Sequence, residues 1–117
     1  MQHQDLKERT KLFALRVLRM FSALPKKTVA QILGKQVLRS GTSIGANFCE
    51  AMRSRSNAEF AAKIGDCLKE LEETRYWLEL IVEAGVMPKK KLSALLDEAT
   101  QLNAIFTTIA KKARSKL

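Results

Sequence analysis

The stretch LRSGTSIGANFCEA, residues 38–51, gathers glycines, hydroxyls and a thiol in one short segment. A phosphate-cradling loop is one reading, but that loop needs a preceding strand and the lysine of a Walker pattern, and both are missing. Ser40 and Ser43 lack a histidine base, because the single histidine of the chain is His3. The segment therefore predicts neither chemistry, and we expect a protein that is not an enzyme.

Metal and redox sites would need other clusters. A di-iron bundle requires a Glu-x-x-His pair from each of two helices, and no histidine follows Glu70 or Glu73 at that spacing. These two glutamates lie one helical turn apart, which is more typical of a solvated acidic face than of a carboxylate pair. Cys49 and Cys67 are too few for a disulfide scaffold, so buried, reduced thiols of a cytoplasmic protein are expected, with a disulfide as the alternative. We expect no metal and no cofactor.

The same stretch is predicted to be helical. From Lys26 to about Arg53, apolar and small residues recur at three- and four-residue steps. The members of this stripe are Val29, Ile32, Leu33, Gln36, Ser40, Ile44, Phe48 and Met52. A glycine inside a helix costs about 1 kcal/mol relative to alanine. Gly41 and Gly45, one turn apart, therefore indicate that another helix approaches this face closely.

Three further helices are predicted. The first begins near Asp5, with Glu8 three residues later, and ends before Pro25. The third begins at Ser56, which can form a capping box with Glu59, and ends at Gly85. The fourth begins at Pro88. Their expected core positions are Leu6, Phe13, Val17, Met20, Phe21 and Leu24; Phe60, Ile64, Cys67, Leu68, Leu71, Leu78, Ile81 and Val82; and Leu92, Leu95, Leu96, Ala99, Leu102, Phe106 and Ile109.

Short turns between these helices predict that sequential helices are antiparallel neighbours. The expected fold is all-α, an antiparallel up-down-up-down four-helix bundle in a single domain, 1–117. If the central turn lies near Ser56, residues of the second and third helices are level when their numbers sum to about 112. This register pairs three sets of opposite charges: Arg39 with Glu73, Glu50 with Lys63, and Arg53 with Glu59. Asn47 is expected to bond to Asp66 or to backbone, with a ligand contact as the alternative.

The formal net charge of +9 is unevenly distributed, because residues 56–88 are net acidic and the rest is basic. A basic surface favours polyanion binding, of RNA or DNA, while solubility alone is the simpler alternative. The candidate phosphate contacts are Arg16, Arg19, Lys26, Lys27, Arg53, Arg55, Lys89, Lys90, Lys91, Lys111, Lys112 and Arg114.

The third helix has more apolar surface than one small bundle can bury. Tyr76, Trp77, Leu80 and Ala84 point away from its core stripe. Such a face typically marks a protein–protein contact, with Trp and Tyr as anchors. We interpret it as a self-association surface; alternatively, Trp77 covers an end of the core. A scaffold that binds another protein, with no nucleic-acid role, is the second functional hypothesis.

No apolar run approaches the ~20 residues of a membrane span, and the start of the chain lacks the apolar centre of a secretory signal. We expect a cytoplasmic protein that does not bind a membrane and has no small-molecule partner.

Several short motifs carry a family resemblance. They are Arg39-Ser40, Gly45-Ala46-Asn47, Glu50-Ala51, Phe60, Lys63, Glu70, Thr74-Arg75 and Trp77-Leu78. In this combination, over essentially the whole chain, the sequence resembles the bacterial 23S rRNA intervening-sequence proteins. Cys49 and Cys67 are the positions to which the resemblance assigns no role.

The resemblance implies an antiparallel four-helix bundle and, for related members, a ring-shaped homopentamer. The family is named after the location of its genes in inserted segments of 23S rRNA, not after an activity. A similar fold occurs in accessory proteins of diversity-generating retroelements, which form basic pentameric barrels thought to bind nucleic acid and reverse transcriptase. Arg39, Gly41, Gly45, Asn47, Glu50, Lys63, Glu70 and Glu73 are the residues to which we assign a structural role on this pattern.

Overall fold

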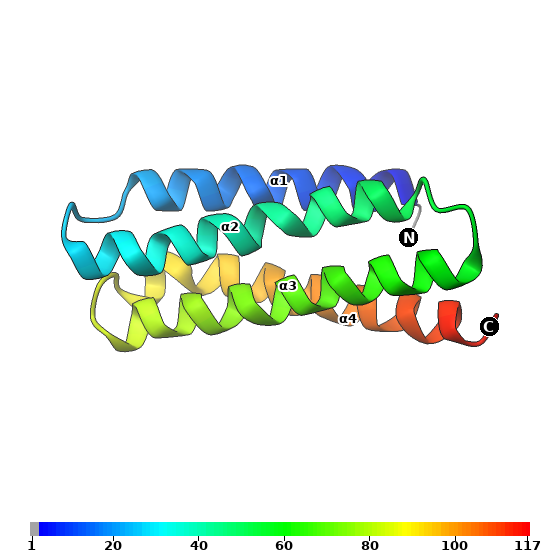
Figure 1. Cartoon of the computed structure of the whole chain (residues 1–117). Helices are drawn as coiled ribbons and strands as arrows, with labels where there is room; N and C mark the ends of the chain where they lie inside the picture. The colour runs from blue at the N-terminus through cyan, green and yellow to red at the C-terminus, as the bar shows by residue number, and fades with distance from the viewer. Residues whose placement is uncertain (1–2) are drawn as a thin grey trace.

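The structure, a computed structural model, describes residues 3–117. Four long helices follow one another: α1 (His3–Ser22), α2 (Thr28–Ala51), α3 (Asn57–Glu83) and α4 (Lys89–Arg114). Consecutive helices run antiparallel and are joined by short turns (Figure 1). The predicted all-α four-helix bundle is confirmed.

The helix ends follow local chemistry. Ser56 is the N-cap of α3, and its Oγ accepts a hydrogen bond from the Glu59 backbone N–H at 3.0 Å. The return half of the predicted capping box is not formed, because the Glu59 carboxylate accepts from the Arg55 N–H instead, at 3.4 Å. Gly85 has φ +72°, so its lack of a Cβ allows the left-handed turn that stops α3. Helix α2 ends at Ala51, slightly before the predicted Arg53.

Helices α1 and α2 approach each other closely at the glycines of α2. A Cβ on Gly41 would lie 2.9 Å from Val17 Cγ2, and one on Gly45 would lie 3.0 Å from Thr10 Oγ1. Both distances are shorter than ordinary contacts between side chains. The predicted close helix contact is therefore present, and its partner is α1.

One core runs the length of the bundle between the four helices. It includes an edge-to-face pair, Phe48 and Phe106, whose ring centroids are 5.6 Å apart. The predicted core stripe of α2 is wrong near its start, because Val29 and Ile32 are 58% and 57% exposed. The buried side there is formed by Ala30, Gly34 and Val37. Small residues occupy it because α1 lies so close.

The register between α2 and α3 agrees with the prediction in two of three pairs. Arg39 bonds Glu73 at 3.2 Å, and Lys63 bonds Glu50 at 3.0 Å. The Arg53–Glu59 pair is wrong: no ion pair joins these two residues in the described chain, since Glu59 turns back to the backbone of the turn. Deep between the helices, the Thr74 hydroxyl donates to Ser40 Oγ at 2.9 Å, so both buried hydroxyls are satisfied.

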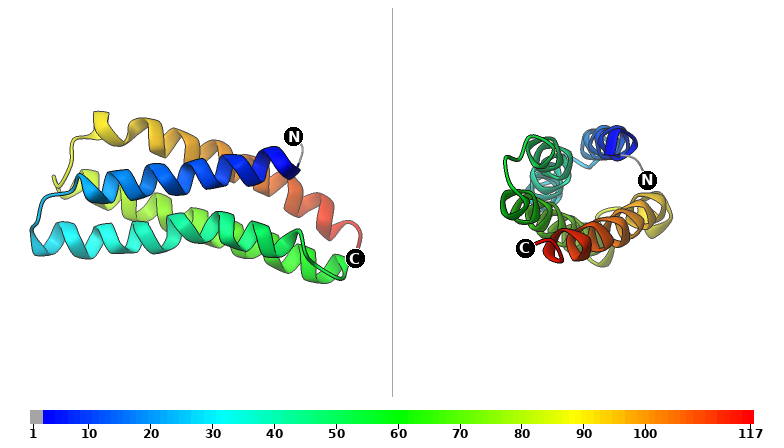
Figure 2. Two further views of the ribbon diagram at one scale, coloured as in Figure 1. Left: turned by 90° about the horizontal axis from the view of Figure 1, so that it is seen from above. Right: turned by 90° about the vertical axis from the view of Figure 1, so that its right-hand side faces the viewer.

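The fourth side of the bundle is the most open. Helices α1 and α2, α2 and α3, and α3 and α4 pack extensively, whereas α1 and α4 make few contacts. Seen along the bundle, the helices trace an arc whose two ends are α1 and α4 (Figure 2). Arg9 bridges this seam, because its guanidinium donates to both carboxylate oxygens of Glu98, at 2.7 and 2.8 Å, and to Gln101 at 2.9 Å.

Candidate nucleic-acid interface

The fold divides the twelve predicted phosphate contacts between the two ends of a bundle that is 46 Å long. Lys26 and Lys27 in the α1–α2 turn share one end with Lys89, Lys90 and Lys91 in the first turn of α4. We call these five residues the lysine end. Arg16 and Arg19, on the last turns of α1, lie close to it. The other five candidates form the far end: Arg53, Arg55, Lys111, Lys112 and Arg114.

The lysine end coincides with the N-termini of two helices. The N-caps of α2 and α4 are Lys27 and Pro88; neither makes a side-chain capping bond, and neither helix has an acidic residue in its first turn. A cation at a helix N-terminus opposes the helix dipole at a cost of about 0.3–1 kcal/mol. Lysines there cannot be explained by helix stability, and together with the uncapped N–H groups they attract anions.

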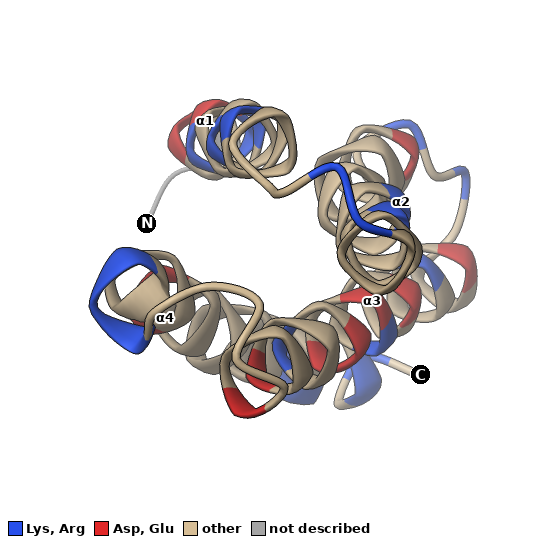
Figure 3. Cartoon of the chain, turned by 90° about the vertical axis from the view of Figure 1, so that its left-hand side faces the viewer, with Lys and Arg blue, Asp and Glu red and all other residues tan. Residues whose placement is uncertain are grey.

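Acidic groups occupy a different corner of the same end. Figure 3 shows Lys and Arg on the start of α4 and on the connection from α1 to α2, whereas Asp and Glu lie along α3. Glu79 and Glu83 are the exposed carboxylates of the last turns of α3. The potential of this end is therefore positive over α1, α2 and α4 and is bounded by α3.

Cations at the far end have a simpler explanation for the most part. Lys111, Lys112 and Arg114 lie in the last turn of α4, where positive charge stabilises the negative end of the helix dipole. Arg53 and Arg55 are exposed in the α2–α3 turn. Helix stability can thus account for three of the five.

A groove in the open seam adjoins the lysine end. It has a volume of about 390 Å³ between α1 and α4. Its floor is apolar, with Met20, Met87 and Leu95, and Arg16, Arg19 and Lys91 supply its cationic walls. No acidic side chain lines it. A groove of this kind can seat part of a polyanion, although its buried floor residues mainly complete the core.

The Arg9–Glu98 ion pair between α1 and α4 also shifts the pKa values of its two members. The hydrogen bonds from Arg9 hold the pKa of Glu98 below its usual value, against the opposing effect of burial. Reciprocally, the bond to Glu98 raises the pKa of Arg9. Sequence reasoning missed this pair because its members are 89 positions apart.

Charged residues between α2 and α3 form ion pairs that fix how these two helices align. Arg39 reaches both Glu70, at 3.4 Å, and Glu73, at 3.2 Å. Burial raises the pKa of Glu70. The pKa of Glu73 is lowered, mainly by a hydrogen bond from Glu70 and next by the hydrogen bond from Arg39. Asn47 lines the same polar hollow as Asp66, but the described residues show no bond between them, so that predicted contact is wrong.

The predicted self-association surface is exposed in part, since Tyr76 and Ala84 are exposed and Trp77 and Leu80 are half-buried, and it extends onto α2. Tyr76 is 57% exposed. Ile32 lies two turns before Arg39 on one face of α2, and Leu80 lies two turns after Glu73 on one face of α3. Since Arg39 bonds Glu73, Ile32 and Leu80 are neighbours. We call this surface the α2–α3 face; its residues are Val29, Ile32, Tyr76, Leu80 and Ala84.

Trp77 agrees in part with the alternative interpretation, in which its ring covers the core. Its ring packs against the core and lies edge-on to Tyr76, with centroids 5.1 Å apart and planes at 74°. The indole Nε1 is buried and has no hydrogen-bond partner. Trp77 therefore supports Tyr76 from below and is not itself the exposed anchor.

A second apolar surface, which sequence reasoning missed, lies on α1. Leu12, Leu15 and Leu18 are 58%, 37% and 44% exposed. Their three-residue spacing places them along one side of the helix, and that spacing was the available signal. We call them the α1 stripe.

Both cysteines are free thiols, and the expected burial is found for Cys67 but not fully for Cys49. Cys67 is buried, and its Sγ–H donates to the Ile44 carbonyl oxygen at 3.6 Å. Burial raises the pKa of Cys67 to about 12, which makes it a poor nucleophile. Cys49 is half-buried. Across residues 3–117 there is no group of three or more His, Cys, Asp or Glu residues placed to hold a metal ion.

No helix among the described residues is long and apolar enough to span a bilayer.

The sequence profile of the 23S rRNA-intervening sequence protein family matches residues 2–108. A crystal structure of a protein of unknown function from the S23 ribosomal protein family of Bacteroides thetaiotaomicron VPI-5482 is similar throughout. It is 34% identical, with a TM-score of 0.88, over 95% of this chain and 99% of that one. No curated protein matches the sequence significantly.

Proposed function

This chain belongs to the 23S rRNA-intervening sequence protein family, and from that premise we propose that it is a non-enzymatic, self-assembling bundle that binds the backbone of RNA or DNA. The observation that carries the proposal is the lysine end. Its five lysines surround two uncapped helix N-termini, where they cost stability and where phosphate would be stabilised. Recognition would be of backbone charge, not base sequence.

Self-assembly is supported by two exposed apolar surfaces that differ from each other. The α1 stripe has Lys11 and Arg19 one turn on either side of Leu15, whereas the α2–α3 face has Glu72 and Glu79 around Tyr76. Opposite charges around the centres of the two surfaces, Leu15 and Tyr76, suit contact between unlike faces of two copies. Contacts between unlike faces generate rings when the rotation closes, in keeping with the homopentamer that the family resemblance implies.

Assembly would strengthen a modest charge per chain. Several copies present several lysine ends to one polyanion, so that each further contact becomes intramolecular. The summed field also accelerates the encounter. We place this activity in the cytoplasm because both cysteines are free thiols.

The test is a titration of labelled RNA and DNA, single- and double-stranded, across a salt series. Two double variants are compared, Lys89→Gln with Lys90→Gln and, as a control of equal charge, Lys7→Gln with Lys69→Gln; all four lysines are exposed. The affinity of the native chain should fall steeply with salt. The first variant should lower the salt slope by about 1 for each phosphate that the protein no longer neutralises, and the control should leave the slope unchanged.

Two results would contradict the proposal. One is an absence of binding even at low salt, which would leave the lysine end as a solubility feature. The other is binding whose affinity does not depend on salt. If the two double variants lowered the salt slope equally, nucleic-acid binding would depend on the overall positive charge of the protein and not on the lysine end.

A protein-binding scaffold is the second candidate, and the α2–α3 face favours it. Tyr76 is 57% exposed and is held in place by Trp77, which suits an anchor in a protein interface. If this candidate is right, Tyr76→Ala abolishes function while Lys89→Gln with Lys90→Gln does not.

A further inference from the structure

Helix α4 carries cations at its two ends and none between Lys91 and Lys111. Ala94, which follows Lys91 by almost one turn, is separated from Lys112 by about five full helical turns. Lys91, Lys112 and Lys116 therefore lie on one side of α4, within about 60° of one another around its axis. We call this the basic side of α4. Helix stability explains cations in the last turn, but it does not explain their alignment with Lys91.

Each end of the basic side opens into a hollow. Lys91 lines the groove of about 390 Å³ between α1 and α4, together with Arg16 and Arg19. Lys112 and Lys116 line a second hollow, of about 400 Å³, at the other end of α4. No carboxylate is among the residues that line either hollow. Both ends therefore offer an anion a recess with cations and no opposing charge.

The middle of the basic side does not repel an anion. Glu98 lies there, but the Arg9 guanidinium donates to both of its carboxylate oxygens, at 2.7 and 2.8 Å. The carboxylates at the start of α1, Asp5 and Glu8, belong to a helix that has separated from α4 at the far end (Figure 2). A polyanion can therefore lie along α4 without meeting an unpaired carboxylate on this side.

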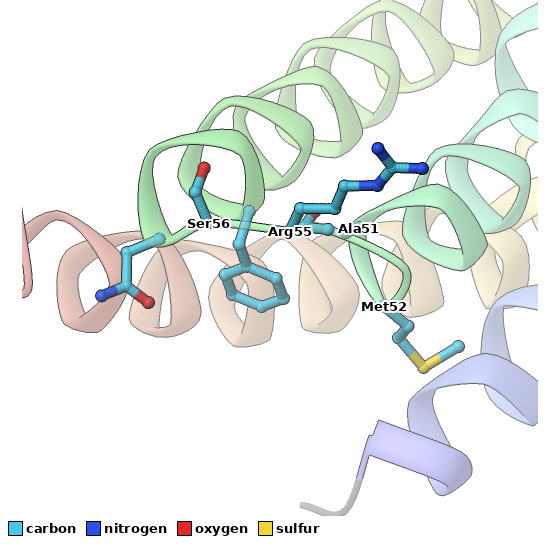
Figure 4. A pocket seen from close by; sticks show the side chains of 7 residues that line it. Ala51, Met52, Arg55 and Ser56 are labelled. Carbon is cyan, nitrogen blue, oxygen red and sulfur yellow. The ribbon is translucent and has the colours of Figure 1, made fainter.

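Two other cations of the far end lie outside the basic side. Arg55 is the one charged residue among those that line a hollow of about 710 Å³ beside the α2–α3 turn. Figure 4 shows its side chain extending away from the end of α4. Arg53 lines none of these hollows. These two arginines therefore supply positive charge at the same end of the bundle without belonging to the basic side.

The distance between the two ends of the basic side matches one turn of a double helix. At 1.5 Å per residue, Lys112 and Lys116 lie about 32 and 38 Å from Lys91 along α4. A B-form duplex repeats after about 10–10.5 base pairs, or about 34–36 Å. A duplex that lies along α4 therefore brings the same strand to both ends of the helix, while a groove faces the uncharged middle.

We propose that the basic side of α4 binds double-stranded nucleic acid along its length, with phosphates of one strand held at Lys91 and, one duplex turn away, at Lys112 and Lys116. The inference rests on the proposed function and names its substrate, a duplex of at least one full turn. A single strand has no fixed repeat and gains nothing from this spacing. Contacts to phosphates carry no base preference.

The test measures binding to DNA hairpins that share one loop, by fluorescence anisotropy across a salt series. At 3.4 Å per base pair, a stem of about 6 base pairs cannot reach both ends of the basic side, whereas a stem of about 14 can. The variant is Lys112→Gln with Lys116→Gln. The control, Arg53→Gln with Arg55→Gln, removes the same charge at the same end; all four residues are exposed. RNA hairpins of the same lengths show which polymer binds more tightly.

The native chain should bind the long stem more tightly, and with a steeper salt slope, than the short stem or a single strand with as many phosphates as the long stem. The variant should lower the salt slope for the long stem by about 2, one for each phosphate no longer neutralised. It should leave the slope for the short stem unchanged, because the more numerous cations of the lysine end hold that stem. The control should change neither slope.

Equal salt slopes for the long stem, the short stem and the single strand would overturn the inference while leaving backbone binding at the lysine end intact. Equal effects of the variant and the control on the long stem would do the same. Failure of the native chain to bind any of these oligonucleotides at low salt would overturn both the inference and the proposed function.

Discussion

Gly41 and Gly65 show that one residue type can have opposite effects in neighbouring helices. A Cβ on Gly41 would lie 2.9 Å from Val17 Cγ2, on a fully buried and stiff side chain. Around Gly65, nothing lies within 4 Å of the corresponding position. Both glycines carry the usual helical cost of about 1 kcal/mol, but only Gly41 has a packing reason for it.

Alanine substitutions at these two positions should therefore have opposite effects. Gly41→Ala forces α1 and α2 apart, and overpacking of about 1–3 kcal/mol exceeds the gain in helix propensity. Gly65→Ala should raise the free energy of unfolding by about 1 kcal/mol. Urea denaturation of both variants measures the difference. Stabilisation by Gly41→Ala would show that the two helices are not in close contact.

The sequence predicted such local features unevenly. Gly41 and Gly45 could be assigned because a glycine inside a helix is costly and needs a reason. The Arg39–Glu73 pair followed from one register rule. Arg53 and Glu59 obeyed the same rule and failed, because they lie at the turn, where the backbone N–H of Arg55 competes for the carboxylate.

Among the helices, α1 is the least firmly held. It packs closely on α2 and makes few contacts with α4, among them the bonds from the Arg9 guanidinium to Glu98 at 2.7 and 2.8 Å. The side chains of the pair are 26% and 17% exposed, so solvent screens them only in part. A partly buried, bidentate pair of this kind contributes about 1 kcal/mol.

The Arg9–Glu98 pair predicts a pH dependence. Arg9 lowers the pKa of Glu98 in the folded protein, so its stabilisation is fully present above the unfolded value of about 4.3 and is lost as the pH falls through the lower folded value. Arg9→Met should cost about 1 kcal/mol at neutral pH and progressively less in acid. The exposed Lys11→Met is the matched control.

Free energies of unfolding between neutral pH and pH 3 would check this. The curves of the native chain and Arg9→Met should converge in acid, and Lys11→Met should stay parallel to the native curve. Parallel curves for Arg9→Met would mean that the pair contributes nothing through the ionisation of Glu98.

Helix positions were predictable from periodicity, capping residues and the two prolines, and short turns gave the antiparallel order. The inward side of α2 was partly wrong because hydrophobicity ranks Val29 and Ile32 above Ala30 and Gly34. Close packing against α1 selects for small size, not hydrophobicity. Likewise, the lysines were visible in the sequence, but their gathering around two helix N-termini depends on segments far apart in the chain.

The whole molecule presents two unlike apolar surfaces on different helices. Around Leu15 the α1 stripe has cations, and around Tyr76 the α2–α3 face has carboxylates, although Glu8 and Lys35 lie near the ends of the two surfaces. If copies meet through these surfaces, each interface uses the stripe of one copy and the face of the next. That arrangement can be distinguished from a symmetric dimer by mixing variants.

Leu12→Glu and Tyr76→Glu disable one surface each. We expect each variant alone to be monomeric by light scattering after size exclusion. Their equimolar mixture should contain dimers and nothing larger, because one intact stripe meets one intact face. Thr100→Glu, at an exposed position of α4, should leave native assembly unchanged.

A symmetric interface would give a different pattern. One of the two single variants would then still form dimers by itself, and mixing would add nothing. A native chain that is monomeric at all accessible concentrations would contradict self-assembly altogether.

The open seam between α1 and α4 has a consequence for how the chain folds. All extensive helix contacts join consecutive helices, so each helix can dock on the one before it without closing a long loop. Such low contact order favours rapid folding. The bonds from Arg9 to Glu98 and Gln101, together with the few other contacts between α1 and α4, link the first and last helices, and they should form last. A nascent chain could therefore complete most of its core one hairpin at a time, before its final helix is available.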